Sequence, residues 1–213
     1  MLKRSQLCRQ QRIVPAGIQR ELIVREDVSA FLRLGEVMRS THSFQLQFSP
    51  IEIGKLARSY GYEDDTELFA AGGRIVGGEC TRSNLEITFR WKTGGRGISR
   101  LGRNSDFEIE DALRLAAVAK TDRSAAAVLR GLYGVNVPVA SAVLTAMDQE
   151  RFTIIDFRAL ESLGVTNYIA TVDYYLQYLE HCRSLANQHG VGLRELDRAL
   201  WQWSKQRRTL KNP

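Results

Sequence analysis

Apolar side chains recur at helical spacing along most of the chain, and polar capping residues mark the points where helices begin. Ser49 with Glu52, and Ser105 with Glu108, each form the pattern of a capping box, in which a hydroxyl and a carboxylate bond free amides at the helix start. The pattern predicts an all-α fold with helices over residues 28–37, 50–60, 64–77, 105–118 and 168–188, and from 193 onward.

Two stretches give mixed signals. Apolar residues alternate along 85–91 as they do in a strand, whereas Ser83 and Glu86 form another capping box. Because the segments that follow are helical, we predict a short helix here. Gly72 and Gly73 lie within the helix predicted before it, and glycine weakens a helix interior.

The segment 129–164 contains two helices joined by a tight turn and, after a short loop, an aspartate that opens a third helix. Gly134 permits the positive φ that a reversal between helices needs, and Asn136 is the next best residue for a left-handed position. Pro138 has its φ preset for the first turn of the second helix. The turn amides therefore point outward without helical partners, and such amides at a helix N-terminus bind phosphate.

Small and branched side chains surround this turn. We expect Val135 and Val137 to pack between the two helices, and Ser141 to let the helices approach closely. Ser141 and Asn136 also carry groups that donate to a phosphate oxygen, with helix packing and turn geometry as the alternative explanations. We predict a phosphate-binding turn formed by Gly134, Val135, Asn136, Val137 and Ser141.

In these residues the chain resembles the helix-hairpin-helix DNA glycosylases, the superfamily of endonuclease III and 8-oxoguanine glycosylase. The residues that match the family pattern are Leu132, Gly134, Val135, Ala140, Val143 and Leu144. Asp156 stands where the family has its catalytic aspartate. The resemblance implies a two-lobed helical fold that binds an extruded base between its lobes.

The chain departs from the family at the hairpin itself. Tyr133 replaces the family's proline, and Asn136 replaces its second glycine. Pro138 stands where bifunctional members have a lysine nucleophile, so the resemblance implies a glycosylase without lyase activity. The iron–sulfur cluster of some members needs four closely spaced cysteines, whereas this chain has only Cys8, Cys80 and Cys182.

Asp156 has two interpretations that are compatible with each other. Aspartate is a favoured N-cap, and a helix is predicted just after it. Cleavage of an N-glycosidic bond also needs a carboxylate, because positive charge develops on the sugar. A carboxylate stabilises that charge and orients the attacking water. We predict that Asp156 is catalytic.

A basic, glycine-rich segment, RWKTGGRGISRLGR, precedes the hairpin. We predict a mobile loop that follows a phosphate backbone, with a solvated loop as the alternative; its basic residues are Arg90, Lys92, Arg96, Arg100 and Arg103. Trp91 belongs either to the core or to a base pocket. Lys92 is also the one candidate for an amine nucleophile, although a phosphate contact is its expected role.

Composition narrows the class of function. The chain has 213 residues, 44% of them hydrophobic, and a net charge of +6, which suits one folded domain with a polyanionic partner. Cysteines and histidines are too scattered for a metal site, and we expect no cofactor. No apolar run is long enough to span a membrane, and we expect a monomer in the cytosol or nucleoid of a bacterial-type cell. The basic residues 1–13 form either a frayed terminus or a phosphate-contacting arm.

We therefore predict one two-lobed domain over residues 1–213, with a central lobe of residues 62–164 and a second lobe from 1–61 and 165–213. The leading functional prediction is a monofunctional DNA glycosylase that extrudes and releases a damaged or modified base. Because the hairpin departs from the family, a hypermodified phage base, and hence antiviral defence, is a further possibility for the substrate. A non-catalytic helix-hairpin-helix DNA-binding protein is the alternative.

Overall fold

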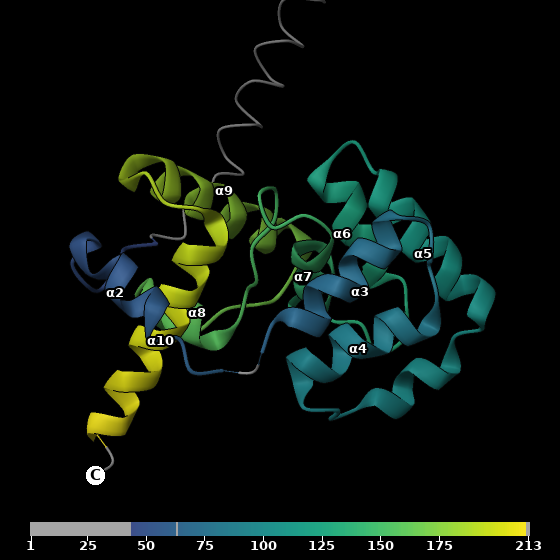
Figure 1. The fold of residues 1–213 in the computed structure, drawn as a ribbon, viewed down its shortest axis with the longest axis horizontal. Coiled ribbons are helices and arrows are strands. Elements are labelled where there is room, and N and C mark those ends of the chain that lie inside the picture. Colours follow the sequence, from purple (N-terminus) through teal and green to yellow (C-terminus); the bar gives the residue numbers. More distant parts are fainter. Residues whose placement is uncertain (1–43, 63, 212–213) are drawn as a thin grey trace, which may run out of the picture. The chain divides into compact units, whose positions relative to one another are not determined.

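The structure, a computed structural model, describes residues 44–62 and 64–211. The regular elements within these ranges are all helices, which confirms the all-α prediction (Figure 1). They are η1 (Pro50–Glu52), α2 (Ile53–Arg58), α3 (Thr66–Val76), α4 (Arg82–Thr93), η2 (Ile98–Arg103), α5 (Asp106–Val118), α6 (Asp122–Arg130), α7 (Val137–Met147), α8 (Phe157–Ser162), α9 (Val172–His189) and α10 (Leu193–Lys211), η marking 3₁₀ helices. The basic segment 1–13 and the helix predicted over 28–37 lie outside the described residues.

Side-chain caps begin several helices, and the capping box of Ser105 and Glu108 is present as predicted. The Ser105 hydroxyl accepts a hydrogen bond from the Glu108 amide at 3.2 Å, and the Glu108 carboxylate accepts one from the Ser105 amide at 2.6 Å. Thr121 caps α6 and Thr171 caps α9, each through the amide three residues ahead. Since Thr171 has an extended backbone, the long helix predicted from residue 168 begins only at Val172.

The ambiguous stretch 85–91 forms part of α4 and is therefore helical, as predicted. Leu85 and Phe89 lie on one face of this helix and are buried in the core. The predicted cap was wrong: Thr81 has the extended backbone of a cap and accepts from the amide three residues ahead, whereas Ser83 is already inside the helix. The alternation of apolar residues thus reflects a helix that is covered on more than one side.

α3 continues through Gly72 and Gly73, the two positions at which the sequence weakened the helix prediction. A Cβ atom built on Gly72 would lie 1.9 Å from the carbonyl oxygen of Ala146 in α7. Only glycine therefore lets the two helices approach this closely. The same atom built on Gly73 would meet no heavy atom within 4 Å, so the second glycine has no such packing reason.

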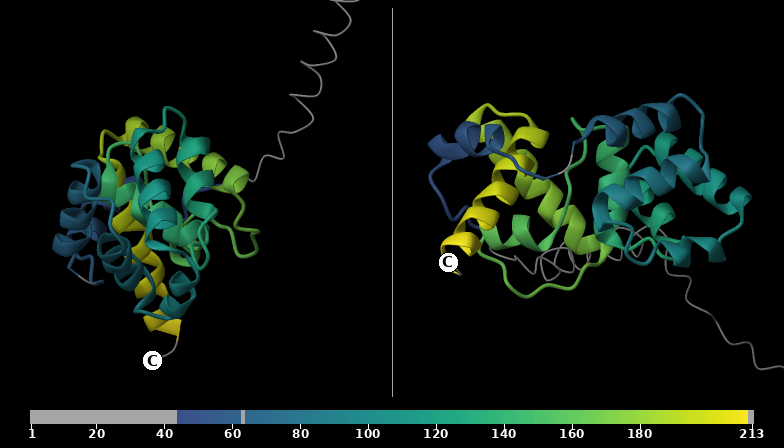
Figure 2. Two further views of the ribbon diagram at one scale, coloured as in Figure 1. Left: turned by 90° about the vertical axis from the view of Figure 1, so that its right-hand side faces the viewer. Right: turned by 60° about the horizontal axis from the view of Figure 1, so that its bottom comes forward.

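The helices pack in two groups that share a core (Figure 1). α10 packs against α2, α8 and α9, while α7 packs against α3, α4 and α6. Figure 2 shows α10, in yellow, beside α2, in blue, from two further directions. The chain crosses between the groups from α2 to α3 and again from α7 to α8. Both crossings bring side chains to the cavity described next.

Candidate functional site

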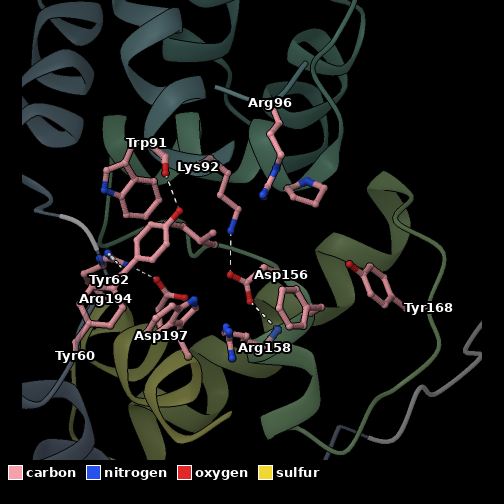
Figure 3. A pocket seen from close by; sticks show the side chains of 14 residues that line it. Tyr60, Tyr62, Trp91, Lys92, Arg96, Asp156, Arg158, Tyr168, Arg194 and Asp197 are labelled. Atoms are coloured by element: carbon pink, nitrogen blue, oxygen red, sulfur yellow. Dashed lines mark hydrogen bonds and ion pairs between the residues drawn. The ribbon is translucent and has the colours of Figure 1, made fainter. Parts of the chain in front are cut away.

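A cavity of about 420 Å³ lies where the two groups of helices meet (Figure 3). Its lining comes from α4, from α10, from the starts of α7 and α8, and from the two crossing segments. The residues that concern the site are Tyr60, Tyr62, Trp91, Lys92, Arg96, Pro138, Asp156, Arg158, Arg194, Asp197 and Trp201. A cavity of this volume accommodates a small organic ligand.

Asp156 is the N-cap of α8 and also forms part of the cavity wall. Its Oδ1 atom accepts hydrogen bonds from the amides of Arg158, at 3.0 Å, and Ala159, at 2.9 Å. The capping interpretation of Asp156 is therefore confirmed. These two bonds fix the carboxylate at the start of the helix and leave Oδ2 directed toward the opposite wall (Figure 3).

Lys92 of α4 completes the contacts of this carboxylate from across the cavity. Its Nζ atom donates to Oδ2 of Asp156 at 3.0 Å, and the two side chains are 10% and 18% exposed, respectively. Burial by itself raises the pKa of Asp156, but the Lys92 ammonium and the two amide hydrogen bonds outweigh it and hold that pKa below its usual range. Asp156 is therefore ionised at neutral pH.

Ser141 connects the carboxylate to the hairpin, although not by the predicted phosphate contact. The side chain is fully buried, its hydroxyl donates to the Pro138 carbonyl at 2.9 Å, and the same oxygen accepts from the Ile155 amide at 3.1 Å. The prediction that Ser141 contacts phosphate was wrong, because its hydroxyl is committed inside the protein. The bond to Ile155 instead fixes the residue before Asp156 against the start of α7.

The turn between α6 and α7 contains the glycine and the asparagine on which the predicted phosphate-binding turn depends. Gly134 has φ +85°, as its sequence position predicted. Asn136 does not take the predicted left-handed conformation; it has φ −88° and ψ 175° and caps α7, its Oδ1 accepting from the Val139 amide at 3.0 Å. Within the described ranges the amides of Gly134, Asn136 and Val137 have no hydrogen-bond acceptor.

Pro138 links this turn to the cavity. It lies in the first turn of α7, as predicted, and its ring lines the cavity that also contains Asp156. The side chains of Val135 and Val137 are buried, as expected for residues that pack between the helices, and the Val135 amide donates to the Leu132 carbonyl at 3.2 Å. The residue that follows the three amides therefore lines the same cavity as the carboxylate.

The basic segment 90–103 is not the single loop that the sequence predicted, because α4 extends to Thr93 and η2 begins at Ile98. Its members consequently have different surroundings. Arg90 lies near Glu86 at 3.6 Å, Lys92 contacts Asp156, and only Arg96 shares the cavity wall with Lys92. For Lys92 the loop position was therefore wrong, whereas the phosphate contact stays a prediction.

The remaining basic residues of the segment lie beside the turn. The Arg103 guanidinium stacks over the half-exposed Tyr133 ring, 3.9 Å from its centroid. A Cβ built on Gly134 would lie 3.0 Å from the Cβ of Arg100, which places η2 directly against the turn. Arg100 thus adjoins the turn at its Cβ atom, and the Arg103 guanidinium lies over the residue that precedes Gly134.

Trp91 belongs to both of the predicted environments, the core and the pocket. It is 7% exposed and packs with Leu68 and Ile154, and one part of its ring forms cavity wall. Tyr62 meets it edge-on, with ring centroids 5.1 Å apart, and Tyr62 meets Trp201 in the same manner at 5.2 Å. The cavity therefore has an aromatic wall on the side away from the turn.

Sequence analysis missed the part of the cavity that α10 supplies. Arg194 donates through Nη1 to Oδ2 of Asp197, while its Nη2 donates to Oδ2 of Asp65 at 2.6 Å. Burial raises the pKa of Asp197 to about 6, with Arg194 opposing the rise and the nearby Asp156 carboxylate adding to it. A sequence signal existed, since Arg194, Asp197 and Trp201 recur at helical spacing beside an apolar stripe.

Comparison of the chain with family models, curated proteins and solved structures finds no match in any of the three. Among the described residues, no cluster of three His, Cys, Asp or Glu side chains is arranged to hold a metal ion. In the same part of the chain no helix is both long and apolar enough to cross a membrane.

Proposed function

We propose that this protein is a monofunctional DNA glycosylase with a two-lobed helix-hairpin-helix fold, which releases an extruded base and leaves an abasic site. The observation that carries the proposal is the position of Asp156. An ionised carboxylate lies on the wall of a cavity whose rim includes Pro138, the residue that follows the outward amides of the turn. A phosphate anchor, a carboxylate and a pocket are the three parts that base excision requires.

The proposed reaction breaks the bond between the sugar C1′ atom and the base nitrogen. The base leaves with the bonding electrons and takes up a proton, while positive charge develops on the sugar. Asp156 stabilises that charge and accepts a proton from the water whose oxygen attacks C1′. In the protein without DNA, the Lys92 ammonium lies 3.0 Å from Oδ2 of Asp156 and keeps the carboxylate ionised. It stands where the proposal places the positively charged sugar during the reaction.

Two features support DNA as the partner. The amides of Gly134, Asn136 and Val137 form a neutral anion cradle at the N-terminus of α7, and Arg100 and Arg103 lie beside it. The aromatic side chains across the cavity present ring faces and edges to a flat ligand such as a base. The released base is either damaged or modified, and a hypermodified phage base would give the protein an antiviral role.

One observation favours the alternative, a non-catalytic helix-hairpin-helix DNA-binding protein. Both oxygens of Asp156 already have partners, namely the α8 amides and Lys92, so capping and ion pairing alone explain the residue. In that case the turn amides and the arginines around them bind DNA, and no bond is broken. The two proposals differ in what removal of the Asp156 charge does to base release.

The deciding experiment measures the formation of abasic sites. The protein and its Asp156→Asn variant are incubated with duplexes that contain single damaged or mismatched bases and with genomic DNA from phages that have modified bases. Alkali then cleaves the strand wherever a base has been lost. Breaks in one substrate that disappear with the variant support the glycosylase. Clear DNA binding without breaks in any substrate supports the non-catalytic protein.

A further inference from the structure

We propose that Asp197 recognises an exocyclic amino group of the extruded base, so that the substrate is an amino-bearing base such as a cytosine or adenine derivative. The inference rests on the proposed function, because it assigns the base that the same cavity receives. It selects against uracil- and thymine-type bases, whose corresponding edge carries carbonyl oxygens.

Asp197 is a carboxylate that is buried and yet borders the cavity. The residue is 5% exposed and projects from α10 toward the space in front of Asp156 (Figure 3). Arg194 donates to its Oδ2 atom, and among the described residues no donor contacts its Oδ1 atom. One carboxylate oxygen is therefore available to a ligand in the cavity.

The surroundings of Arg194 hold this carboxylate in one orientation. The guanidinium also donates to Asp65, through Nε at 3.2 Å and Nη2 at 2.6 Å, and its Nη2 lies 3.4 Å from the Tyr60 hydroxyl. With three of its nitrogens committed, Arg194 cannot follow a ligand into the cavity. The Asp197 oxygen is consequently presented to a base without reorganisation, which favours specificity.

Hydrogen-bond chemistry then determines which base fits. An ionised carboxylate only accepts hydrogen bonds, and acidic side chains recognise bases through amino donors such as N4 of cytosine. A carbonyl oxygen at the same place repels the carboxylate and leaves Asp197 buried without compensation. The aromatic wall adds stacking, which does not distinguish among bases.

The protonation state of Asp197 supplies a second test of the same contact. Its pKa lies at about 6, so the group is an acceptor above that pH and becomes a donor below it. The titratable and charged groups around it are Arg194, Asp65, Tyr60, Arg198, Asp156, Lys92, Tyr178 and Cys182. A change of preference near pH 6 that disappears with Asp197→Asn is therefore assigned to Asp197.

The experiment compares duplexes that differ only at position 4 of one base. The pairs are 5-hydroxymethylcytosine against 5-hydroxymethyluracil and 5-formylcytosine against 5-formyluracil. Base release is measured at pH 7.5 and pH 5 for the wild type, Asp197→Asn and Asp122→Asn. Asp122 does not line this cavity and forms its ion pairs with Arg151 and Arg183. The affinity of the Asp156→Asn protein for each duplex gives a second readout, which does not need turnover.

We expect the wild type to prefer the amino member by about tenfold at pH 7.5, because a hydrogen bond to a charged group is gained or lost. The preference decreases at pH 5. Asp197→Asn abolishes or reverses it at both pH values, because an amide also donates, whereas Asp122→Asn retains it. Equal release of both members by the wild type overturns the inference while the glycosylase proposal stands. If no base is released, the affinity ratio of the Asp156→Asn protein decides the inference alone, and a ratio of one overturns it.

Discussion

Asp122 and Asp156 are two aspartates in similar chemical surroundings and in different regions of the molecule. Each lies at the start of a helix, α6 or α8, and each is paired with basic side chains while partly buried. Burial opposes ionisation at both, yet the basic partners and hydrogen bonds hold both pKa values below the usual range. By residue type and protonation state the two are nearly equivalent.

Asp122 and Asp156 differ in their ion-pair partners and in whether a cavity lies beside them. Asp122 is clamped between two arginines, with Oδ1 2.8 Å from Nε of Arg151 and Oδ2 2.7 Å from Nη1 of Arg183, which joins α6 to α9 and to the loop after α7. Asp156 instead faces one lysine across a cavity. An ammonium on a flexible stem yields more readily to an arriving cation than two planar guanidinium groups do. Geometry, not charge, separates the structural carboxylate from the functional candidate.

We expect the largest difference in the rate of base release between variants in which Asp156 or Asp122 is replaced by asparagine. Asp156→Asn lowers the rate of base release by about 10²–10³-fold, because a preorganised charge beside the sugar is lost. Asparagine keeps the helix cap, although Lys92 loses its ionised partner, so the variant is expected to fold with a lower free energy of unfolding. Asp122→Asn leaves the rate unchanged and lowers the free energy of unfolding by about 1–3 kcal/mol, because two arginines lose their partner. Single-turnover kinetics and urea unfolding measure both, and equal rates for the two variants would contradict the distinction.

Helix starts in this chain are predictable from sequence because a cap is a local interaction. The cap formed by Ser105 and Glu108 was identified from two residues three positions apart, and the structure has it. Gly134 was identified by the same reasoning, because a turn between adjacent helices restricts its own φ. Asn136 shows the limit: a cap and a left-handed position favour the same residue type, and the sequence alone does not distinguish them.

The site could be predicted only in part because most of it comes from distant segments. Lys92 lies 64 positions before Asp156, and nothing in the local pattern around either residue indicates their contact. The sequence therefore grouped Lys92 with its basic neighbours in a loop. Asp197 and Arg194 were missed because a polar face on an amphipathic helix is normally solvated. Only the packing of α10 against the rest of the core turns that face into a cavity wall.

Asp197 extends the comparison to a carboxylate whose contribution to stability depends on pH in the opposite direction. Its pKa rises from 3.8 to about 6 in the folded protein, so the folded state binds the proton more tightly than the unfolded chain does. That contribution to stability is present below pH 3.8 and is lost as the pH rises through about 6. For Asp122, whose pKa is lowered, the contribution is present above pH 3.8 and is lost as the pH falls through its folded pKa.

We therefore expect the stability of the wild type relative to Asp197→Asn to decrease by about 2 kcal/mol between pH 4 and pH 6.5. The stability of the wild type relative to Asp122→Asn should stay level over the same range. Urea unfolding of the three proteins at half-unit intervals measures both curves. If the stability difference between the wild type and Asp197→Asn did not change with pH, the pKa of Asp197 would have its ordinary value and burial would not raise it.

Substitution of Lys92 tests whether this residue keeps Asp156 ionised. Lys92→Met removes the ammonium that opposes burial, so the pKa of Asp156 rises and the protonated form accumulates in mild acid. Base release at pH 5 should fall by about tenfold, with a smaller loss at pH 8. Lys92→Arg should retain most of the wild-type pH profile. Arg90→Met is the matched control, because it removes a cation two positions away on α4 that does not line this cavity. A uniform loss at all pH values would assign Lys92 to DNA binding.

The smallest predicted effect distinguishes Gly134, in the turn that is proposed to bind DNA, from Gly190, which ends α9. Gly134 and Gly190 both have positive φ, +85° and +65°, so alanine at either position should lower the free energy of unfolding by about 1 kcal/mol. A Cβ on Gly134 would also lie 3.0 Å from the Cβ of Arg100, whereas one on Gly190 would meet no atom within 4 Å. Relief of that contact moves the turn and its outward amides.

Gly134→Ala should therefore weaken DNA binding by about 1 kcal/mol, or roughly fivefold, because amides at a helix N-terminus lose their alignment with phosphate. Gly190→Ala should bind DNA as the wild type does, although it is destabilised to a similar degree. Fluorescence anisotropy with an undamaged duplex at two salt concentrations measures the affinity apart from base release. If both variants bind equally well, the turn between α6 and α7 is a structural feature of the same kind as the end of α9, and the anion cradle lies elsewhere.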